Sequence, residues 1–468
     1  MLIVKSFSYF VLIRLTGTKI CIKTEVLLTF IQSIAILLQM ENILKNARQD
    51  WMYIILSTVS GFLMIGFYFV LANLVKLDEF TAFLITLVLF SLLFDVRHFF
   101  PTYTRTFLDK EYFKEHKSWL LGSTAAIVLI PLISYFILIQ GEAMAYNGQI
   151  VLSFARRVTL TLGFYHLIKQ NWGFIAIYKK KFNEPEDGSD RWEKLLLLSG
   201  SFIPFVYLAK TKTIWFYDEI SAFTPNANEL AYVLEFWGKI SAYMLVLGLF
   251  FLVIGFAINA RPQYKYVSRN LGYYFIGIFI LIKLILVNGS DKVLYVILIA
   301  LAVLFVFSLI LTLQKAFKFG KLNIRKWAMM LSALVLYWGV LSLPIENKGL
   351  IIIGITIPHN IQYLAFVGLF NKKHYGGSTK NHGLATILSQ KAILFFIVSV
   401  LFSFVFELGR TGTTMNLFTD PDAFILKNIV AFLFLSLVMH HYYLDAVIWR
   451  VRKDEDLGKD IFALKKAK

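Results

Sequence analysis

The chain has 468 residues and a formal net charge of +18, with 58% hydrophobic and only 16% charged residues. A soluble protein carries about 25% charged residues and cannot hide this much apolar surface, so the composition excludes a soluble fold and predicts a helical membrane protein. The lysines and arginines recur in loops between apolar runs instead of forming one basic face, which excludes nucleic acid as a partner.

Residues 1–50 fit a membrane span poorly and are treated as an N-terminal extension. The apolar run at 26–39 is too short to span confidently. Met40 opens MENILKNARQDW, which is typical of a cytoplasmic start before a first span, so we expect residues 1–39 to be dispensable. The single cysteine, Cys21, excludes an internal disulfide and a cysteine-built metal site.

Residues 51–449 contain about twelve apolar runs, each near the ~20 residues that a spanning helix needs. They lie near 51–75, 80–97, 119–140, 149–177, 194–210, 231–259, 270–289, 293–314, 327–345, 350–370, 391–406 and 424–449. Loops rich in Lys and Arg alternate with poorer ones, and the tail 450–468 is basic, which places the basic loops and both termini in the cytoplasm. We therefore expect an all-α transmembrane bundle of about twelve spans in a bacterial inner membrane.

Four of these apolar segments each place a histidine within one helical turn of a second polar side chain. The pairs are Asp95/His98, His166/Gln170, His359/Gln362 and His441/Asp445. A spacing of three or four puts both members on one helix face. Burying a charged side chain at membrane depth costs about 2.5–3.5 kcal/mol. Ionisable residues at such positions are therefore functional candidates by default. The predicted topology puts all four histidines in the cytoplasmic half of one bundle, which predicts an intramembrane metal site.

The predicted metal ligands come from all four segments. They are Asp95, His98, His166, His359, His440, His441 and Asp445. Neighbours on a helix diverge by about 100°, so the His440/His441 doublet requires a dinuclear site or one residue outside the coordination sphere. Gln170, Asn360 and Gln362 are expected to orient the imidazoles. Singly, each histidine could instead be a packing residue that bonds another helix.

Imidazole and carboxylate without thiolate suit iron, manganese or zinc. A dry, aromatic-rich cavity favours iron, in a mononuclear or dinuclear site, with zinc as the alternative. Arg97 and Arg105, which flank His98, are expected to bind a substrate head group together with Tyr103. Positive-inside anchoring and snorkelling explain most of the other arginines at the cytoplasmic rim. His374 and His382 fall in a basic loop, where we expect solvated side chains.

Four sequence blocks carry a resemblance that covers most of the chain after Trp51. They are DVRHFFPTYTRTFLD, GFYHLIKQNWGFIAIYKKK, TIPHNIQYLAFVGLFNKKHY and HHYYLDAVIWRVRKD. Together they resemble a poorly characterised family of bacterial polytopic membrane proteins, which implies no particular activity. More loosely, the histidine arrangement is similar to that of membrane di-iron enzymes such as alkane hydroxylases, fatty-acid desaturases and carotenoid-cleaving oxygenases. The chain lacks the HxxxH and HxxHH boxes of the first two, so this similarity concerns chemistry alone.

These observations favour an integral-membrane non-haem iron oxygenase or oxidase that acts on a lipid or another apolar substrate from the cytoplasmic side, with an electron-donor protein as partner. One alternative is a zinc-dependent lipid hydrolase or transferase with the same ligands. The other is a proton- or metal-coupled transporter. The transporter is less favoured because the outer half of the bundle shows no comparable polar track.

Overall fold

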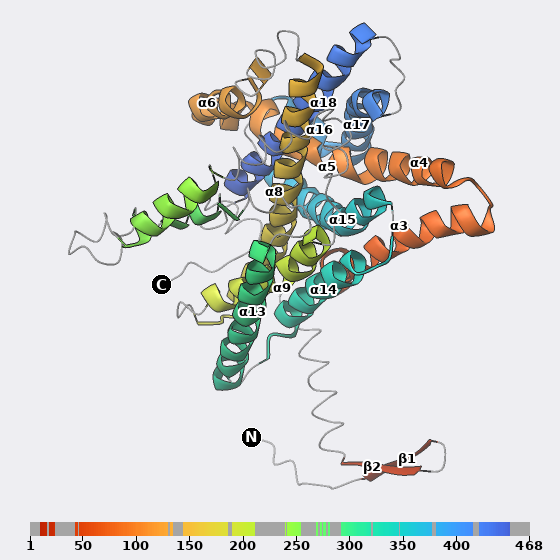
Figure 1. Cartoon of the computed structure of the whole chain (residues 1–468). Coiled ribbons are helices and arrows are strands. Elements are labelled where there is room, and N and C mark those ends of the chain that lie inside the picture. The colour runs from red at the N-terminus through yellow and green to blue at the C-terminus, as the bar shows by residue number, and fades with distance from the viewer. Residues whose placement is uncertain are drawn as a thin grey trace.

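The computed structural model describes residues 10–15, 18–23, 43–44, 46–129, 132–133, 144–185, 190–210, 292–319, 322–345, 347–376, 381–414 and 421–449, together with short helical pieces between 239 and 280. Within these residues the chain is helical, as predicted, apart from one antiparallel hairpin of β1 (Phe10–Leu15) and β2 (Thr18–Lys23). Figure 1 shows this hairpin apart from the helices.

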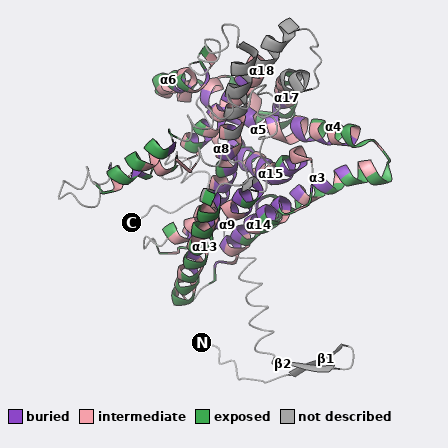
Figure 2. Ribbon diagram, viewed as in Figure 1, coloured by how far each residue is buried: buried purple, intermediate pink, exposed green. Residues whose placement is uncertain are grey.

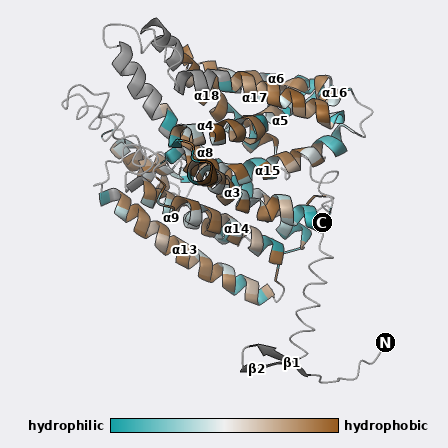
Figure 3. Ribbon diagram, turned by 90° about the vertical axis from the view of Figure 1, so that its right-hand side faces the viewer, coloured by the Kyte–Doolittle hydropathy of each residue, from teal (hydrophilic) through white to brown (hydrophobic). Residues whose placement is uncertain are grey.

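Six helical segments are long and apolar enough to cross a membrane. They are Ala47–Leu74, Glu79–Leu108, Leu294–Phe319, Ile324–Leu341, Lys348–His374 and Ile429–Ile448. A bent pair, Leu384–Gln390 with Ala392–Glu407, gives a seventh candidate, in which the chain bends by 113° between the two helices. Hydrophobic residues cover most of the length of these helices (Figure 3). The chain is therefore an integral membrane protein.

These segments match seven of the twelve predicted spans. Two further predicted spans, 149–177 and 194–210, lie within the long helices α8 (Met144–Lys181) and α9 (Asp190–Lys210). The predicted span 119–140 is helical through α6 (Lys110–Thr124) and a following π-helical turn, Ala125–Leu129. The predicted spans 231–259 and 270–289, and both chain ends, lie largely outside the described residues. The count of twelve and the cytoplasmic termini stay predictions.

Helix α15 (Lys348–His374) is the most buried of the candidate spans. In its most apolar stretch 72% of the residues are buried, against 11% for the span Leu294–Phe319 within α13 (Lys292–Phe319). Figure 2 shows the same contrast, with α15 mainly buried and α13 exposed along its length. Around α15 pack α3 (Val59–Phe69), α5 (Val96–Tyr103), α8 and α14 (Ile324–Leu341). A side chain on α15 is thus shielded from lipid on most sides.

Two glycines allow α3 and α15 to cross closely. A Cβ atom on Gly61 would lie 2.2 Å from the carbonyl oxygen of Gly354, so neither helix could keep its position with a larger residue at Gly61. Small residues at crossings of this kind let membrane helices approach through their backbones. The crossing holds α3 against the central helix.

The span that begins with α4 (Glu79–Phe90) is irregular where it enters the bundle core. A π-helical turn, Ser91–Asp95, precedes α5, and a second one, Thr104–Leu108, follows it. Pro101 lies between them and lacks an N–H group, which weakens the regular hydrogen-bond ladder. Interruptions of this kind are frequent at functional sites. This one presents His98 and Thr102 to the bundle interior.

Candidate metal centre

Four helices bring histidines from distant parts of the chain into one cluster. His98 comes from α5, His166 from α8, His359 from α15 and His441 from α18 (Pro421–Ile448). His98, His359 and His441 are at most 4% exposed, and the His166 side chain is 12% exposed. A buried cluster of four imidazoles needs specific partners, because each ring carries two polar nitrogens.

The four imidazoles form a closed circuit, in which each ring lies next to two of the others. The ring centroids are 5.1 Å apart between His98 and His359, 4.9 Å between His359 and His166, 5.6 Å between His166 and His441, and 4.8 Å between His441 and His98. Each ring lies at 65° or more to its neighbours in this circuit. The rings therefore surround a common region instead of stacking along one line.

Asp445 completes the cluster from one turn beyond His441. Its Oδ2 lies 3.6 Å from His441 Nε2 and 3.8 Å from His166 Nε2. His166, His441 and Asp445 each offer a ligand atom, and these atoms lie within 4.8 Å of one another. Two imidazoles and one carboxylate at this separation can bind one transition-metal ion after small adjustments, since metal–nitrogen and metal–oxygen bonds are about 2.0–2.2 Å long.

A buried hydroxyl fixes the orientation of His441. Thr102 Oγ1 donates its proton to Asp445 Oδ1 at 2.7 Å and lies 2.9 Å from His441 Nδ1. Because the hydroxyl has one proton, its oxygen accepts the N–H of His441 Nδ1. His441 Nε2 is then unprotonated and available to a metal. Tyr363 supports the same carboxylate, donating to Asp445 Oδ1 at 3.0 Å.

Several of the remaining imidazole nitrogens either face another imidazole or have no hydrogen-bond partner among the described atoms. His441 Nε2 faces His98 Nε2 at 3.1 Å. Two imidazoles on one ion at ~2.1 Å lie about 3.0–3.4 Å apart, so this separation suits joint ligation. Among the described atoms, neither nitrogen of His359 has a hydrogen-bond partner, and neither does His166 Nε2. Leaving such a group unpaired costs about 1–3 kcal/mol each, which a bound ion would offset.

A cavity of about 650 Å³ lies beside the cluster, between α8, α15 and α18. His166, Tyr363 and Asp445 contribute to its wall, so the cavity adjoins two of the candidate ligand residues, His166 and Asp445. Most of the other lining residues are aromatic or aliphatic. They include Leu162, Tyr165, Trp172, Phe174, Ile177, Phe366, Met439, Tyr442, Tyr443 and Trp449. The polar exceptions are Lys169 and Gln170. Such a lining accommodates an apolar molecule.

Two predicted ligands lie apart from the cluster. His440 is buried but faces another side of α18, where its Nε2 lies 3.2 Å from Ser123 Oγ on α6. This divergence of the doublet follows from helix geometry, and the packing of α6 and α5 decides which member faces the cluster. Asp95 is half-buried, lies close to Tyr442, and is absent from the group of converging ligand atoms.

The three residues expected to orient the imidazoles take other roles. Gln170 donates to the backbone carbonyl of His359 at 3.0 Å and to Gln362 Oε1 at 2.9 Å, while Gln362 donates to the Ile54 carbonyl at 2.8 Å. They join α8, α15 and the first span without touching a ring nitrogen. Asn360 is fully buried, and its amide has no hydrogen-bond partner among the described atoms.

The residues expected to bind a head group are committed to other contacts and are absent from the cavity wall. Arg97 donates to Ser399 Oγ at 3.0 Å and lies over the Phe396 ring, both on α17 (Ala392–Thr414). Tyr103 donates to the Leu437 carbonyl at 3.2 Å. Arg105 is 5% exposed and is stacked on aromatic rings, including that of Trp449 at 4.3 Å. The cation that does line the cavity is Lys169.

The sequence prediction missed the residues that organise the cluster. Thr102 lies four residues after His98, Tyr363 four after His359 and Trp449 four after Asp445, whose partner Tyr363 accepts the Trp449 N–H at 3.1 Å. The four-residue spacing that identified His441 and Asp445 would have identified them too, had hydroxyl and indole N–H groups been counted.

No protein-family model, no curated protein and no solved structure matches this chain. The interpretation of the cluster therefore depends on the geometry of the described residues.

Proposed function

We propose that this protein is an integral-membrane non-haem iron enzyme, an oxygenase or oxidase that acts on a lipid or another apolar substrate. The observation that carries the proposal is that His166, His441 and Asp445 converge, and that two of them, His166 and Asp445, line a cavity whose wall is mainly apolar. Two histidines and one carboxylate with open coordination positions are typical of non-haem iron oxygenases. An apolar wall excludes water from a reactive oxidant.

The two further histidines support a site with more than one ion. Between ring centroids, His98 lies 4.8 Å from His441, and His359 lies 4.9 Å from His166. They provide ligands for a second iron or complete the coordination of the first. Zinc accepts the same donors, and a zinc-bound water would then make the protein a lipid hydrolase or transferase.

The cavity indicates the class of substrate. Its volume of about 650 Å³ lies within the ~300–1,000 Å³ range of small-molecule sites. An acyl or isoprenoid chain suits its aromatic and aliphatic lining, and Lys169 is positioned to meet a polar end group. Hydroxylation of a C–H bond by O₂ consumes two electrons and two protons and releases one water, so an electron-donor protein is the expected partner.

The location belongs to the same proposal. The alternation of basic loops and the four-block resemblance to bacterial membrane proteins favour the bacterial inner membrane, with the centre in the cytoplasmic half of the bundle. An electron donor would then approach from the cytoplasm.

Metal analysis of the purified full-length protein, prepared without chelators, tests the proposal. Wild type should hold stoichiometric iron, and His441→Ala should fold but lose most of it, because a ligand has gone while the apolar packing remains. His440→Ala is the matched control: it removes the neighbouring buried histidine, which lies outside the cluster, and should retain the metal. Equal loss in both variants contradicts the assignment.

The identity of the metal and oxygen uptake separate the alternatives. Bound iron with oxygen consumption on addition of apolar substrates supports the oxygenase. Stoichiometric zinc without oxygen uptake favours the hydrolase or transferase. Wild-type protein without any transition metal favours a proton-coupled transporter, in which the same histidines carry protons.

A further inference from the structure

A second group of histidines lies at the far end of α15, outside the cluster described above. His374 is the last residue of α15, and His382 precedes the short helix α16 (Leu384–Gln390). Asp109 lies between the π-helical turn Thr104–Leu108 and α6. His374 is fifteen positions beyond His359, about 22 Å along the helix axis at ~1.5 Å per residue, so the two groups are separate.

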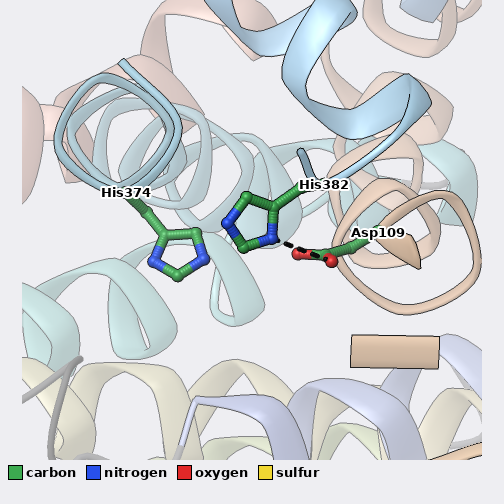
Figure 4. A group of neighbouring side chains, drawn as sticks. All are labelled: Asp109, His374 and His382. Carbon is green, nitrogen blue, oxygen red and sulfur yellow. Dashed lines mark hydrogen bonds and ion pairs between the residues drawn. The ribbon is translucent and has the colours of Figure 1, made fainter. Parts of the chain in front are cut away.

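The three side chains converge, although the sequence predicted solvated histidines. Asp109 is 2% and His382 6% exposed, and their atoms Oδ1 and Nδ1 are 3.1 Å apart. The rings of His374 and His382 lie 4.9 Å apart between centroids. Each of the three residues offers a ligand atom, and these atoms all lie within 4.8 Å of one another. In Figure 4 a nitrogen of His374 faces the His382 nitrogen that is not bonded to Asp109.

Backbone and side-chain contacts hold Asp109 in place. As the N-cap of α6 it accepts the N–H groups of Glu111 and Tyr112 at 3.0 and 3.1 Å, and its Oδ2 accepts the Tyr375 hydroxyl at 3.1 Å. These bonds leave the carboxylate fixed and facing His382. A carboxylate that accepts one N–H of a histidine orients the other nitrogen toward a metal, an arrangement common in zinc proteins.

The segment that carries His382 is pinned as well. The His382 carbonyl accepts the Lys110 N–H at 3.1 Å, and the His382 N–H donates to Thr386 Oγ1 at 3.1 Å. The next residue, Gly383, has φ +69°, a conformation that favours glycine. On the other side His374 stacks on Phe370 at 4.8 Å. All three side chains are therefore positioned before any ion arrives.

We propose that His374 and His382, with Asp109 orienting His382, form a second binding site, for one divalent transition-metal ion of the zinc type. Imidazole nitrogens are borderline donors that prefer such ions to Mg²⁺ or Ca²⁺. Two protein ligands leave at least two coordination positions for water or an incoming group. The ion links the end of α15 to the segment before α16, which Asp109 ties to the start of α6.

The hydrogen bond between Asp109 and His382 could also exist without an ion, with His374 only packed beside it. Titration of the full-length protein distinguishes the two. Purified protein stripped with a chelator is titrated with Co²⁺ alone, and the bound equivalents are counted by the ligand-field absorption and by metal analysis. His374→Ala should lose one equivalent while keeping the Asp109–His382 bond. Asp109→Asn, which preserves the helix cap, should weaken this equivalent by about 10–100-fold.

His116→Ala is the control, since this histidine lies one to two turns into α6 and stacks on Tyr112 at 4.2 Å without joining the group. It should bind as wild type does. His441→Ala should keep the Co²⁺ equivalent that His374→Ala loses. The two variants therefore test this site and the central cluster separately, and this site can be confirmed even if the proposed function fails. Unchanged Co²⁺ binding in both His374→Ala and His374→Ala/His382→Ala overturns the proposal.

Discussion

A single hydroxyl joins three helices at the centre of the cluster. Thr102 on α5 contacts His441 and Asp445 on α18, and its oxygen lies 2.8 Å from the Tyr363 hydroxyl on α15. It is completely buried, so no solvent replaces these contacts. The position of His441 Nε2 thus depends on one threonine that is itself no ligand.

Replacing Thr102 by valine tests this dependence. Valine has nearly the same shape but cannot accept the His441 N–H, so the imidazole can adopt the wrong tautomer. We expect metal affinity to fall by about 10–100-fold, the effect usual for partners of metal ligands, with normal expression. Affinity is measured by competition with a chromophoric chelator. Thr86→Val, which removes a buried hydroxyl bonded to its own helix, should have no such effect.

Gly163 on α8 makes room for Tyr442, whose ring stacks on His166 with centroids 4.7 Å apart. A Cβ atom at Gly163 would lie 2.7 Å from the Tyr442 hydroxyl oxygen. Gly163→Ala should therefore displace Tyr442, lower the melting temperature by an amount equivalent to about 1–3 kcal/mol, and disturb His166. Adding Tyr442→Phe removes the closest atom and should restore part of the loss.

Gly173→Ala on the same helix is the matched control, because nothing lies within 4 Å of its Cβ position. It should be neutral or slightly stabilising, as alanine favours helix more than glycine does. If both alanines lower the melting temperature equally, the close contact with Tyr442 is unimportant.

At the scale of whole helices, a buried group of charges joins the ends of α8, α9 and α14. Lys326 Nζ donates to Glu184 Oε2 at 2.9 Å and to Glu193 Oε1 at 2.8 Å, and Lys179 also pairs with Glu193 and with Asp190. The side chains of Lys326, Glu184 and Glu193 are at most 4% exposed. The group fixes where the three helices meet.

Lys326→Met should leave two buried carboxylates undercompensated. Removing one partner of a buried ion pair costs about 3–5 kcal/mol, so the melting temperature of the purified protein should fall clearly. Lys318→Met, at an exposed position of α13, should change it by no more than the equivalent of ~0.5 kcal/mol. A fall of similar size in both would show that loss of positive charge matters more than burial.

The same group indicates how stability depends on pH. Burial disfavours the charged amine of Lys179, but Glu193 and Asp190 outweigh this and raise the pKa of Lys179 above its ordinary value. A raised folded-state pKa contributes stability that is fully present below about pH 10.4, the unfolded value, and is lost as the pH rises through the folded value. The contribution of this lysine is therefore intact at neutral pH.

At the scale of the whole molecule, the predicted topology makes opposite assignments for two exposed positions. Lys76 lies at the tip of the α3–α4 hairpin, which Figure 1 shows projecting from the other helices, and Lys372 lies in the last turn of α15. The charge pattern predicts that the first is outside and the second cytoplasmic. In a Cys21→Ser background, Lys76→Cys should react with an impermeant thiol reagent in intact cells, and Lys372→Cys only after lysis. The reverse pattern contradicts the topology.

The sequence was sufficient for features that depend on local periodicity. Apolar runs located the candidate spans, and the four-residue spacing located His441 and Asp445, because both signals arise within one helix. Which of His440 and His441 faces the cluster depends on how α18 is rotated against its neighbours, and periodicity within one helix does not determine that rotation. The approach of His382 to Asp109 required a contact between segments 273 positions apart, for which a sequence contains no periodic signal.

Trp449 gives the protein a built-in optical probe of its own centre. Its indole lies in the cavity wall, donates to Tyr363, and faces the Arg105 guanidinium at 4.3 Å. Tryptophan emission responds to nearby charge, hydrogen bonding and paramagnetic ions, so loading the cluster should quench this residue and an apolar guest should shift its emission to shorter wavelength. The difference between wild type and Trp449→Phe isolates that signal from the other eight tryptophans of the chain. Ligand screening can then proceed by fluorescence, before any substrate or turnover is known.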